Sequence, residues 1–468
     1  MFRPSMLACG LLLAGTAAGV ELSPDGSGQV LVFPYYTAND GQDTLVTIGS
    51  LADRAQVVKV RFLEGYNSRP VLDFDLYLPA NETWVGAVTK AADGRAMLRT
   101  PSLTCTVPAL PAAGAAFSTA QFDGSGGLPA DAGPHDVERT REGFIEVISG
   151  GTIASETGTF GAIVGLERTC TPLPGSLFED IDGPGEAIYG TAAVISVGQG
   201  LYYAYDATAL DGFSPDPLYS PAMGPLDPSL ADAGGHLAGA DASIPGYGLV
   251  HFDRKIDAVS AVLAKTTLSN QYVAPSGLGA RSDWVVSMPT QRYYTDPAIS
   301  GSPTALPPFD DVFQAPGVAP LRFANPWIYD RLGNPCAGDD CQYETEFHLD
   351  RSVNVIAYAT PQQAEVGASG VFGSHLATYL YPYGESGHTR LQPYRLREME
   401  GVDLSPRQQG HVCVSGVPAL GFLAYNLVNA NAQPGRLANY GGIYRDQWYG
   451  ADVRARDGQW IQGCNPSE

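Results

Sequence analysis

Between residues 29 and 89, apolar and polar side chains alternate along short segments, and this alternation constrains the fold more than any other feature. Residues 58–62 (VKVRF) and 72–78 (LDFDLYL) each have one apolar and one polar face, as is typical of half-buried antiparallel strands. Three more segments complete a series of five predicted strands, at Gln29–Tyr36, Thr44–Ser50 and Thr83–Thr89. Turn-forming Asn, Asp, Gly and Pro residues separate the strands. The series therefore predicts a meander whose apolar face is covered by a second sheet, as in an immunoglobulin-like sandwich.

The rest of the chain predicts further strands between long loops rich in Gly, Pro and Asp, at 110–143, 215–246 and 298–320. The predicted strands are Phe144–Ser149, Ala192–Ala207, Trp284–Met288, Tyr343–Ala359, Val371–Tyr383, His411–Val414 and Leu420–Val428. One helix is predicted at Ile256–Leu268. We expect a mainly β protein of two or more antiparallel, immunoglobulin-like β-sandwich domains with few helices. The expected divisions are a signal peptide (1–19), an N-terminal β-sandwich region (20–210) and a C-terminal β-rich region with one short helix (211–468).

The first 19 residues have the pattern of a secretory signal peptide. Arg3 precedes an apolar run from Met6 to Ala18, which is shorter than the roughly 20 residues needed to span a bilayer. Small residues at 17–19 then offer a cleavage site. Cys9 allows a second interpretation, as a lipid-attachment cysteine, although the apolar run continues well past it. We expect a mature chain without a transmembrane segment, secreted to the periplasm or the cell exterior.

Six cysteines follow residue 19, and an even number in an exported chain indicates disulfide bonds. Pairing in sequence order is the simplest arrangement, although other connectivities are open. It would join Cys105 to Cys170, Cys336 to Cys341, and Cys413 to Cys464. A zinc site is not expected, because the paired C-x-x-C spacing is missing and no His stands at ligand spacing.

Composition and charge narrow the classes of partner. The apolar fraction of 44% is sufficient for a packed core, which argues against global disorder. The formal net charge of −22 repels phosphate backbones, so nucleic acid is a poor partner. The abundant carboxylates leave Ca²⁺ as the one cofactor that the sequence keeps open.

Five short motifs resemble those of a group of uncharacterised secreted proteobacterial proteins. They are LVFPYYT at Leu31–Thr37, KVRFLEG at Lys59–Gly65, DFDLYL at Asp73–Leu78, SDWVV at Ser282–Val286 and NYGG at Asn439–Gly442. The motifs span most of the chain. The resemblance implies export and a bacterial envelope setting, and it transfers no activity and no catalytic residue.

Four polar residues alternate along the predicted strand at 343–349 and just beyond it: Glu344, Glu346, His348 and Asp350. Alternate residues of a strand share a face and lie roughly 6.5–7 Å apart. Carboxylates at such distances can serve glycoside hydrolysis or bind a hard cation, which makes these four the candidate catalytic residues. The simpler interpretation is the solvated face of an amphipathic strand.

Tyr379, Tyr381 and Tyr383 form a second candidate, a stripe on one face of the predicted strand at 371–383. Exposed tyrosines of this kind stack on sugar rings or anchor a protein partner. The alternative is ordinary packing of tyrosines in the core or across neighbouring strands.

Other signals of chemistry are weak. Three acidic loops could supply oxygen ligands to Ca²⁺, at Asn39–Asp43, Asp180–Gly183 and Asp339–Asp340, but none has a complete EF-hand pattern, and turn chemistry explains them equally. The sequence contains no G-x-S-x-G, H-E-x-x-H or P-loop motif, so no metal or nucleophile site is predicted.

Three functional hypotheses follow. The first is an exported extracellular or envelope protein that is structural, adhesive or ligand-binding and is not an enzyme, meeting its partner through long loops. The second is a polysaccharide-binding module or glycan-active enzyme, which would use the tyrosine stripe and the acidic strand face. The third is a subunit of a surface assembly that grows by strand addition.

Overall fold

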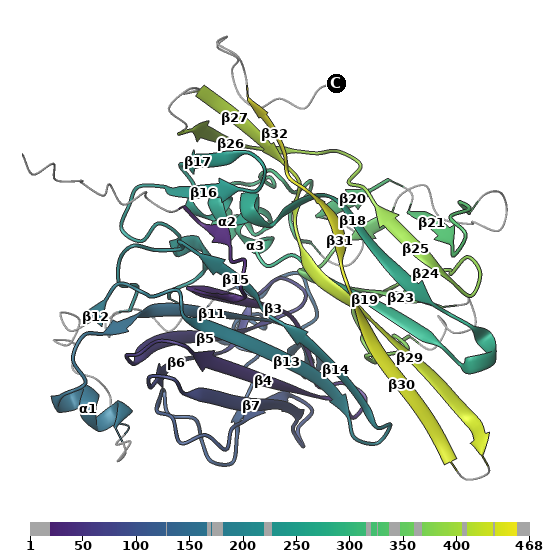
Figure 1. The fold of residues 1–468 in the computed structure, drawn as a ribbon, viewed down its shortest axis with the longest axis horizontal. Helices are drawn as coiled ribbons and strands as arrows, with labels where there is room; N and C mark the ends of the chain where they lie inside the picture. Colours follow the sequence, from purple (N-terminus) through teal and green to yellow (C-terminus); the bar gives the residue numbers. More distant parts are fainter. Residues whose placement is uncertain are drawn as a thin grey trace, which may run out of the picture.

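The computed structural model describes residues 19–127, 129–165, 170, 181–219, 227–314, 320–324, 326–336, 347–359, 367–404, 410–433 and 436–455. These residues form a mainly β protein with several sheets, almost all of whose strand pairs are antiparallel. The predicted signal segment lies outside the described residues, apart from Gly19. In Figure 1 the strands of the N-terminal half lie in layers at the lower left, and the C-terminal half lies beside them at the upper right.

The N-terminal half contains two sheets. In the described residues the first sheet has the order β1-β15-β3-β11-β5-β6-β9, with β12 beside β11, and the second has the order β10-β8-β7-β4-β13-β14, with β2 beside β13. The bounds in the first sheet are β1 (Glu21–Leu22), β3 (Val30–Thr37), β5 (Gln56–Glu64), β6 (Pro70–Leu78), β9 (Thr106–Val107), β11 (Glu142–Ile153), β12 (Ile181–Asp182) and β15 (Thr208–Asp211). The bounds in the second sheet are β2 (Ser27–Gly28), β4 (Asp43–Ser50), β7 (Thr83–Lys90), β8 (Ala96–Arg99), β10 (Ala115–Ala116), β13 (Ile188–Ser196) and β14 (Leu201–Asp206).

The five strands predicted between residues 29 and 89 are all present, within two residues of their expected ends, as β3 to β7. They do not form one meander. The strands β3, β5 and β6 belong to the first sheet, whereas β4 and β7 belong to the second. The sheets pack face to face, with the rings of Phe74 and Trp84 5.8 Å apart. The chain therefore crosses between two sheets that pack against each other.

Strand β3 lies inside the first sheet and is buried along its whole length. Burial on both faces explains its nearly continuous apolar sequence. Pro34 is unusual in such a strand because it has no N–H to donate to a neighbour. The register between β3 and β11 shifts at this point, between Gly143 and Ile145, so the proline lies at an irregularity that interrupts the regular pairing.

The C-terminal half contains, in the described ranges, three sheets with five strands each and one strand pair. The sheets are β16-β17-β26-β27-β32, then β21-β25-β18-β28 with β31 beside β18, then β24-β23-β19-β29-β30; β20 pairs with β22. The bounds are β16 (Ala240–Ile244), β17 (Gly248–Phe252), β18 (Ala264–Val273), β19 (Arg281–Ser287), β20 (Leu321–Phe323), β21 (Trp327–Asp330), β22 (Phe347–Leu349), β23 (Val353–Tyr358), β24 (Ala377–Leu380), β25 (Ser386–Leu391), β26 (Glu398–Asp403), β27 (Gly410–Ser415), β28 (Val417–Pro418), β29 (Leu420–Gln433), β30 (Arg436–Arg445), β31 (Gln447–Gly450) and β32 (Asp452–Ala455).

The predicted helix at Ile256–Leu268 is present but shorter. The helix α2 (Lys255–Leu263) starts one residue before the predicted start, and the chain then passes directly into β18. Two β-branched threonines, Thr266 and Thr267, favour the strand, and pairing with β25 stabilises it. The other α-helices in the described residues are α1 (Gly158–Val164), α3 (Arg292–Thr295) and α4 (Pro297–Ser300).

The two halves meet at a packed junction. One hydrophobic cluster of buried side chains runs through both, and the rings of Tyr205 and Phe422 stack across the boundary at 4.5 Å. Buried Glu142, at the start of β11, accepts hydrogen bonds from Tyr35 in the N-terminal half and from Ser374 and the His375 amide in the C-terminal half. Apolar packing and buried hydrogen bonds therefore hold the halves together.

Cys105 and Cys170 form a disulfide bond, as predicted. Cys336 and Cys413 are also disulfide-bonded. Their predicted partners, Cys341 and Cys464, lie outside the described residues, so these two pairings stay predictions.

Candidate functional site

A cavity of about 560 Å³ opens where the first sheet meets α3 and α4 from the C-terminal half. This volume falls in the range of roughly 300–1,000 Å³ found for small-molecule sites. The lining has an apolar part and a charged part, which we call its apolar side and its charged side. The apolar lining includes Pro70, Pro129, Pro297, Ile299 and Phe313. The charged and polar lining includes Arg61, Asn67, Arg69, Asp131, Glu146, Arg292, Tyr293 and Asp296.

A row of charges crosses three adjacent strands of the first sheet, and two of its members, Arg61 and Glu146, line the cavity. Arg61 on β5 lies opposite Glu146 on β11 and opposite Asp73 on β6. Its guanidinium is 2.8 Å from Glu146 Oε2 and 3.2 Å from Asp73 Oδ1. Side chains in register on neighbouring strands point to the same face, which is why these three meet.

Glu146 is the least satisfied group in this row. Its side chain is fully buried, and its Oε1 atom has no hydrogen-bond partner within the part of the chain that the structure describes. Burial raises the pKa of Glu146 to about 7, although the charge of Arg61 opposes that rise. A buried acceptor without a donor is costly, so this oxygen favours a hydrogen bond from a molecule in the cavity.

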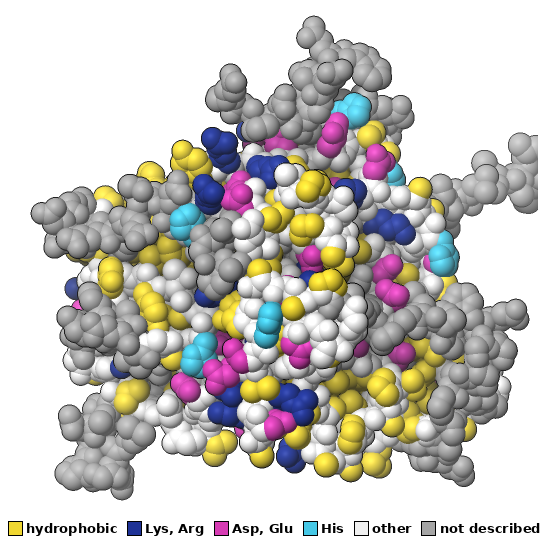
Figure 2. All heavy atoms as spheres, turned by 180° about the vertical axis from the view of Figure 1, so that it is seen from behind, with side chains coloured by type: hydrophobic (Ala, Val, Ile, Leu, Met, Phe, Trp, Pro, Cys, Tyr) yellow, Lys and Arg dark blue, Asp and Glu magenta, His cyan; other side chains and the backbone are white. Residues whose placement is uncertain are grey.

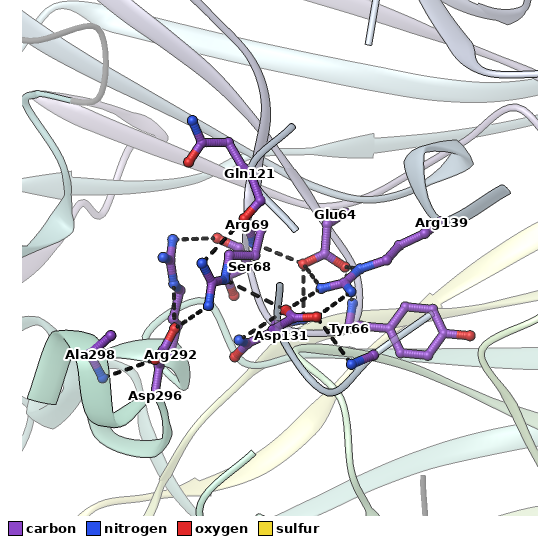
Figure 3. A network of polar contacts seen from close by, with 12 residues as sticks. Glu64, Tyr66, Ser68, Arg69, Gln121, Asp131, Arg139, Arg292, Asp296 and Ala298 are labelled. Atoms are coloured by element: carbon purple, nitrogen blue, oxygen red, sulfur yellow. Dashed lines mark hydrogen bonds and ion pairs between the residues drawn. The ribbon is translucent and has the colours of Figure 1, made fainter. Parts of the chain in front are cut away.

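A second charged cluster shapes the turn between β5 and β6 (Figure 3). Arg139 is fully buried and donates to both oxygens of Glu64, at 2.8 and 3.0 Å, and to both oxygens of Asp131, at 2.6 Å each. Glu64 in turn accepts hydrogen bonds from the backbone amides of Asn67 and Arg69. The cluster thereby fixes two of the three turn residues that line the cavity, Asn67 and Arg69.

The third group joins the two halves of the protein. Arg69 lies 3.1 Å from Asp296 of the C-terminal half, and Arg292 lies 3.3 Å from the same carboxylate (Figure 3). Arg292 also donates to the Ser68 carbonyl at 3.3 Å. Burial, together with the nearby charge of Arg69, lowers the pKa of Arg292. Asp296 also accepts the Ala298 amide at the start of α4, which orients this helix at the rim of the cavity.

The raised pKa of Glu146 predicts a specific dependence of stability on pH. The folded protein holds this proton up to about pH 7, whereas the unfolded chain releases it near pH 4.5. The unfolded state therefore binds fewer protons between these values, and the contribution of Glu146 to stability falls as pH rises. From pH 4.5 to pH 8, we expect wild type to lose up to about 3 kcal/mol more free energy of unfolding than Glu146→Gln.

Urea unfolding of both proteins across this range measures the difference. Taking the difference removes the contributions of groups common to both, including Asp446, whose pKa burial also raises to about 7. Parallel pH curves for the two proteins would contradict the assignment of a proton to Glu146.

The residues predicted as catalytic or binding lie elsewhere. Glu344 and Glu346 lie outside the described residues. His348 is half-buried on β22, and Asp350 follows that strand and lies 3.7 Å from Arg351. The stripe does not lie on one strand, because β24 ends at Leu380, after Tyr379 and before Tyr381 and Tyr383. None of the described members of these two sets lines the cavity.

The loop Asn39–Asp43, predicted as a possible Ca²⁺ ligand, faces the junction between the halves. Asn39 donates to Glu142, and Gln42 donates to the Val371 carbonyl. Asp180 and the Asp339–Asp340 loop lie outside the described residues. Among the residues that are described, no group of three or more His, Cys, Asp or Glu side chains is placed to hold a metal ion.

The alternating pattern of β5 and β6 also indicates the charged lining of the cavity, although a polar strand face is more often exposed to solvent. Lys59, Arg61, Asp73 and Asp75 were expected on a solvated strand face, and they do share one face. That face is largely buried, however, with Lys59 and Arg61 each 4% exposed. Basic residues on one strand opposite acidic residues on the next are the feature that could have indicated a covered, internally paired surface.

Comparison with protein-family models, curated proteins and solved structures finds no match. In the portion of the chain that is described, no helix has the length and apolar character needed to cross a membrane. Because no match was found, the function of the site is inferred from its geometry.

Proposed function

We propose that the protein is an exported, non-enzymatic binding protein that holds a small polar molecule in the cavity beside Glu146. The observation that carries the proposal is the Oε1 atom of Glu146, which is buried in a cavity and lacks a partner among the described residues. An apolar side with a few convergent polar groups is the usual composition of a small-molecule site. The Cys105–Cys170 disulfide supports export, because disulfides persist outside reducing compartments.

The charged side of the cavity is suited to binding because its groups hold one another in place. Arg61, Arg69 and Arg292 are each fixed by at least one carboxylate within 3.5 Å. Side chains that are already ordered lose little entropy when a ligand arrives. Acidic and basic side chains lie interspersed on the face in Figure 2, so this face has no large patch of one charge to attract a ligand from a distance. Selectivity then arises inside the cavity, from contact, more than from a field of one sign.

A second candidate function has one observation in its favour. A carboxyl group with a pKa of about 7 suits a general acid or base at neutral pH. A glycan-active enzyme would use Glu146 in that role. Product release by wild type, lost in Glu146→Gln, would favour this second function over binding alone.

Blocking the cavity tests the proposal. Ala298 is exposed on α4 at the cavity rim, so we expect Ala298→Trp to fill the opening without breaking an ion pair. A ligand at 100 times its Kd stabilises wild type by about 2.7 kcal/mol. In a thermal-shift screen of small polar metabolites, every compound that stabilises wild type through this site should fail to stabilise Ala298→Trp.

The matched control is Ala92→Trp, which places the same ring on the exposed turn between β7 and β8, away from the cavity. This variant should respond like wild type. Compounds that stabilise Ala298→Trp and wild type equally would show that binding occurs elsewhere and would overturn the proposal.

A further inference from the structure

Three buried polar atoms, each in a residue that lines the cavity, lack hydrogen-bond partners in the described part of the chain. They are the acceptors Glu146 Oε1 and Asn67 Oδ1 and the donor Arg69 Nε, which lies 3.5 Å from Asp131 Oδ2 but at poor hydrogen-bond geometry. All three are buried atoms of side chains that other contacts hold in place. A ligand that satisfies them must offer at least two donors and one acceptor.

The charges of the buried lining argue against an ionic ligand. Three arginines, Arg61, Arg69 and Arg292, face three buried acidic groups, Asp131, Glu146 and Asp296, and a fourth lining carboxylate, Asp227, is exposed. An anion would bring a further negative charge against the carboxylates, and an ammonium group would bring a positive charge against the arginines. With both signs already paired inside the site, the ligand that costs least to transfer from water is uncharged.

The apolar side sets a third condition. Pro70, Pro297 and Phe313 line the cavity together with the polar atoms. The ligand therefore needs a face of C–H groups in addition to its hydroxyl or amide groups. Hydroxyl groups both donate and accept, so they suit a site with unpaired groups of both kinds.

We infer that the cavity binds a neutral saccharide, with sugar hydroxyls donating to Glu146 Oε1 and Asn67 Oδ1 and a sugar oxygen accepting from Arg69 Nε. The C–H face of the ring lies against the prolines and Phe313. This inference rests on the proposed function and adds the chemical class of the ligand. It differs from the sequence-based glycan hypothesis, because it uses none of the residues on which that hypothesis depended.

The test is isothermal titration of the disulfide-bonded mature chain with matched sugars that differ in charge. The neutral members are glucose, galactose, mannose, maltose and cellobiose, and the charged members are glucuronate and glucosamine. We expect at least one neutral sugar to bind, and glucuronate and glucosamine to bind at least about 10-fold more weakly than that sugar. Glu146→Gln and Asn67→Ala should each weaken the neutral sugar at least about 10-fold. The surface control Glu138→Gln should leave its affinity unchanged.

The outcomes separate the inference from the proposed function. If glucuronate or glucosamine binds more tightly than every neutral sugar in the set, or if no neutral sugar binds at a concentration of about 10 mM, the saccharide inference is wrong. A compound of another class that binds wild type but not Ala298→Trp would then leave the proposed function standing. A neutral sugar that binds Ala298→Trp as tightly as wild type would overturn both statements for this cavity.

Discussion

Replacing Arg139 with Met lowers the free energy of unfolding by about 3–5 kcal/mol, because the change leaves buried Glu64 without its counter-charge and leaves Asp131 with Arg69 alone, 3.5 Å away. The side chain of Arg139 is fully buried, and those of Glu64 and Asp131 are 0% and 5% exposed. The methionine retains much of the volume that packs over Phe122, whose ring centre lies 4.3 Å from the guanidinium carbon. The loss is therefore mainly electrostatic, and urea unfolding of both proteins measures it.

The matched control is Arg54→Met, which removes an arginine from an ion pair of similar length at the surface. Arg54 lies 2.9 Å from Asp182, and their side chains are 44% and 56% exposed. Exposed pairs contribute at most about 1 kcal/mol, because water and salt screen them. Equal losses in the two variants would show that the buried cluster does not hold the β5–β6 turn in the way described.

Replacing Glu142 with Ala has the second large effect, a loss of at least about 3 kcal/mol, because four donors then lack their acceptor in a buried site. The donors are the Tyr35 hydroxyl at 3.0 Å, the Asn39 amide at 2.5 Å, the Ser374 hydroxyl at 2.5 Å and the His375 backbone amide at 2.8 Å. Two of these donors belong to each half, so the substitution weakens the contacts that join the halves. Hydrogen exchange at the His375 amide should accelerate together with the drop in stability.

Glu138→Ala provides the control, since Glu138 lies four residues earlier, is 56% exposed and pairs only with Arg141 at 3.2 Å among the contacts described. Its removal should change stability by less than about 1 kcal/mol. A Glu142→Ala protein with wild-type stability and unchanged exchange at His375 would show that this carboxylate does not stabilise the junction.

The regular strands near the N-terminus could be predicted from the sequence because local patterning fixes them. Apolar residues at every second position, bounded by turn formers, determine β5 and β6 within two residues. The disulfide between Cys105 and Cys170 matches the pairing expected from sequence order, one of several that the sequence left open. The end of α2 was missed because pairing with β28 and β31, more than 150 residues later, begins at Ala264 and Lys265, directly after the helix.

The sharing of strands between two sheets could not be predicted, because each strand of residues 29–89 has the same local pattern whichever layer it joins. For the same reason, the candidate site could not be recognised from the sequence. Arg61 and Glu146 look like outward-facing residues of ordinary strands until α3 and α4, about 150 residues beyond Glu146, cover them. Residues chosen for alternation alone, such as Tyr379 and His348, lie outside the cavity that tertiary packing creates.

A crystal structure of the protein soaked with a neutral disaccharide shows whether the cavity beside Glu146 is the binding site. We expect a sugar hydroxyl within about 3.2 Å of Glu146 Oε1, with the ring against Phe313 and Pro297. A cavity that holds only water while the disaccharide occupies another surface would rule out binding at this site.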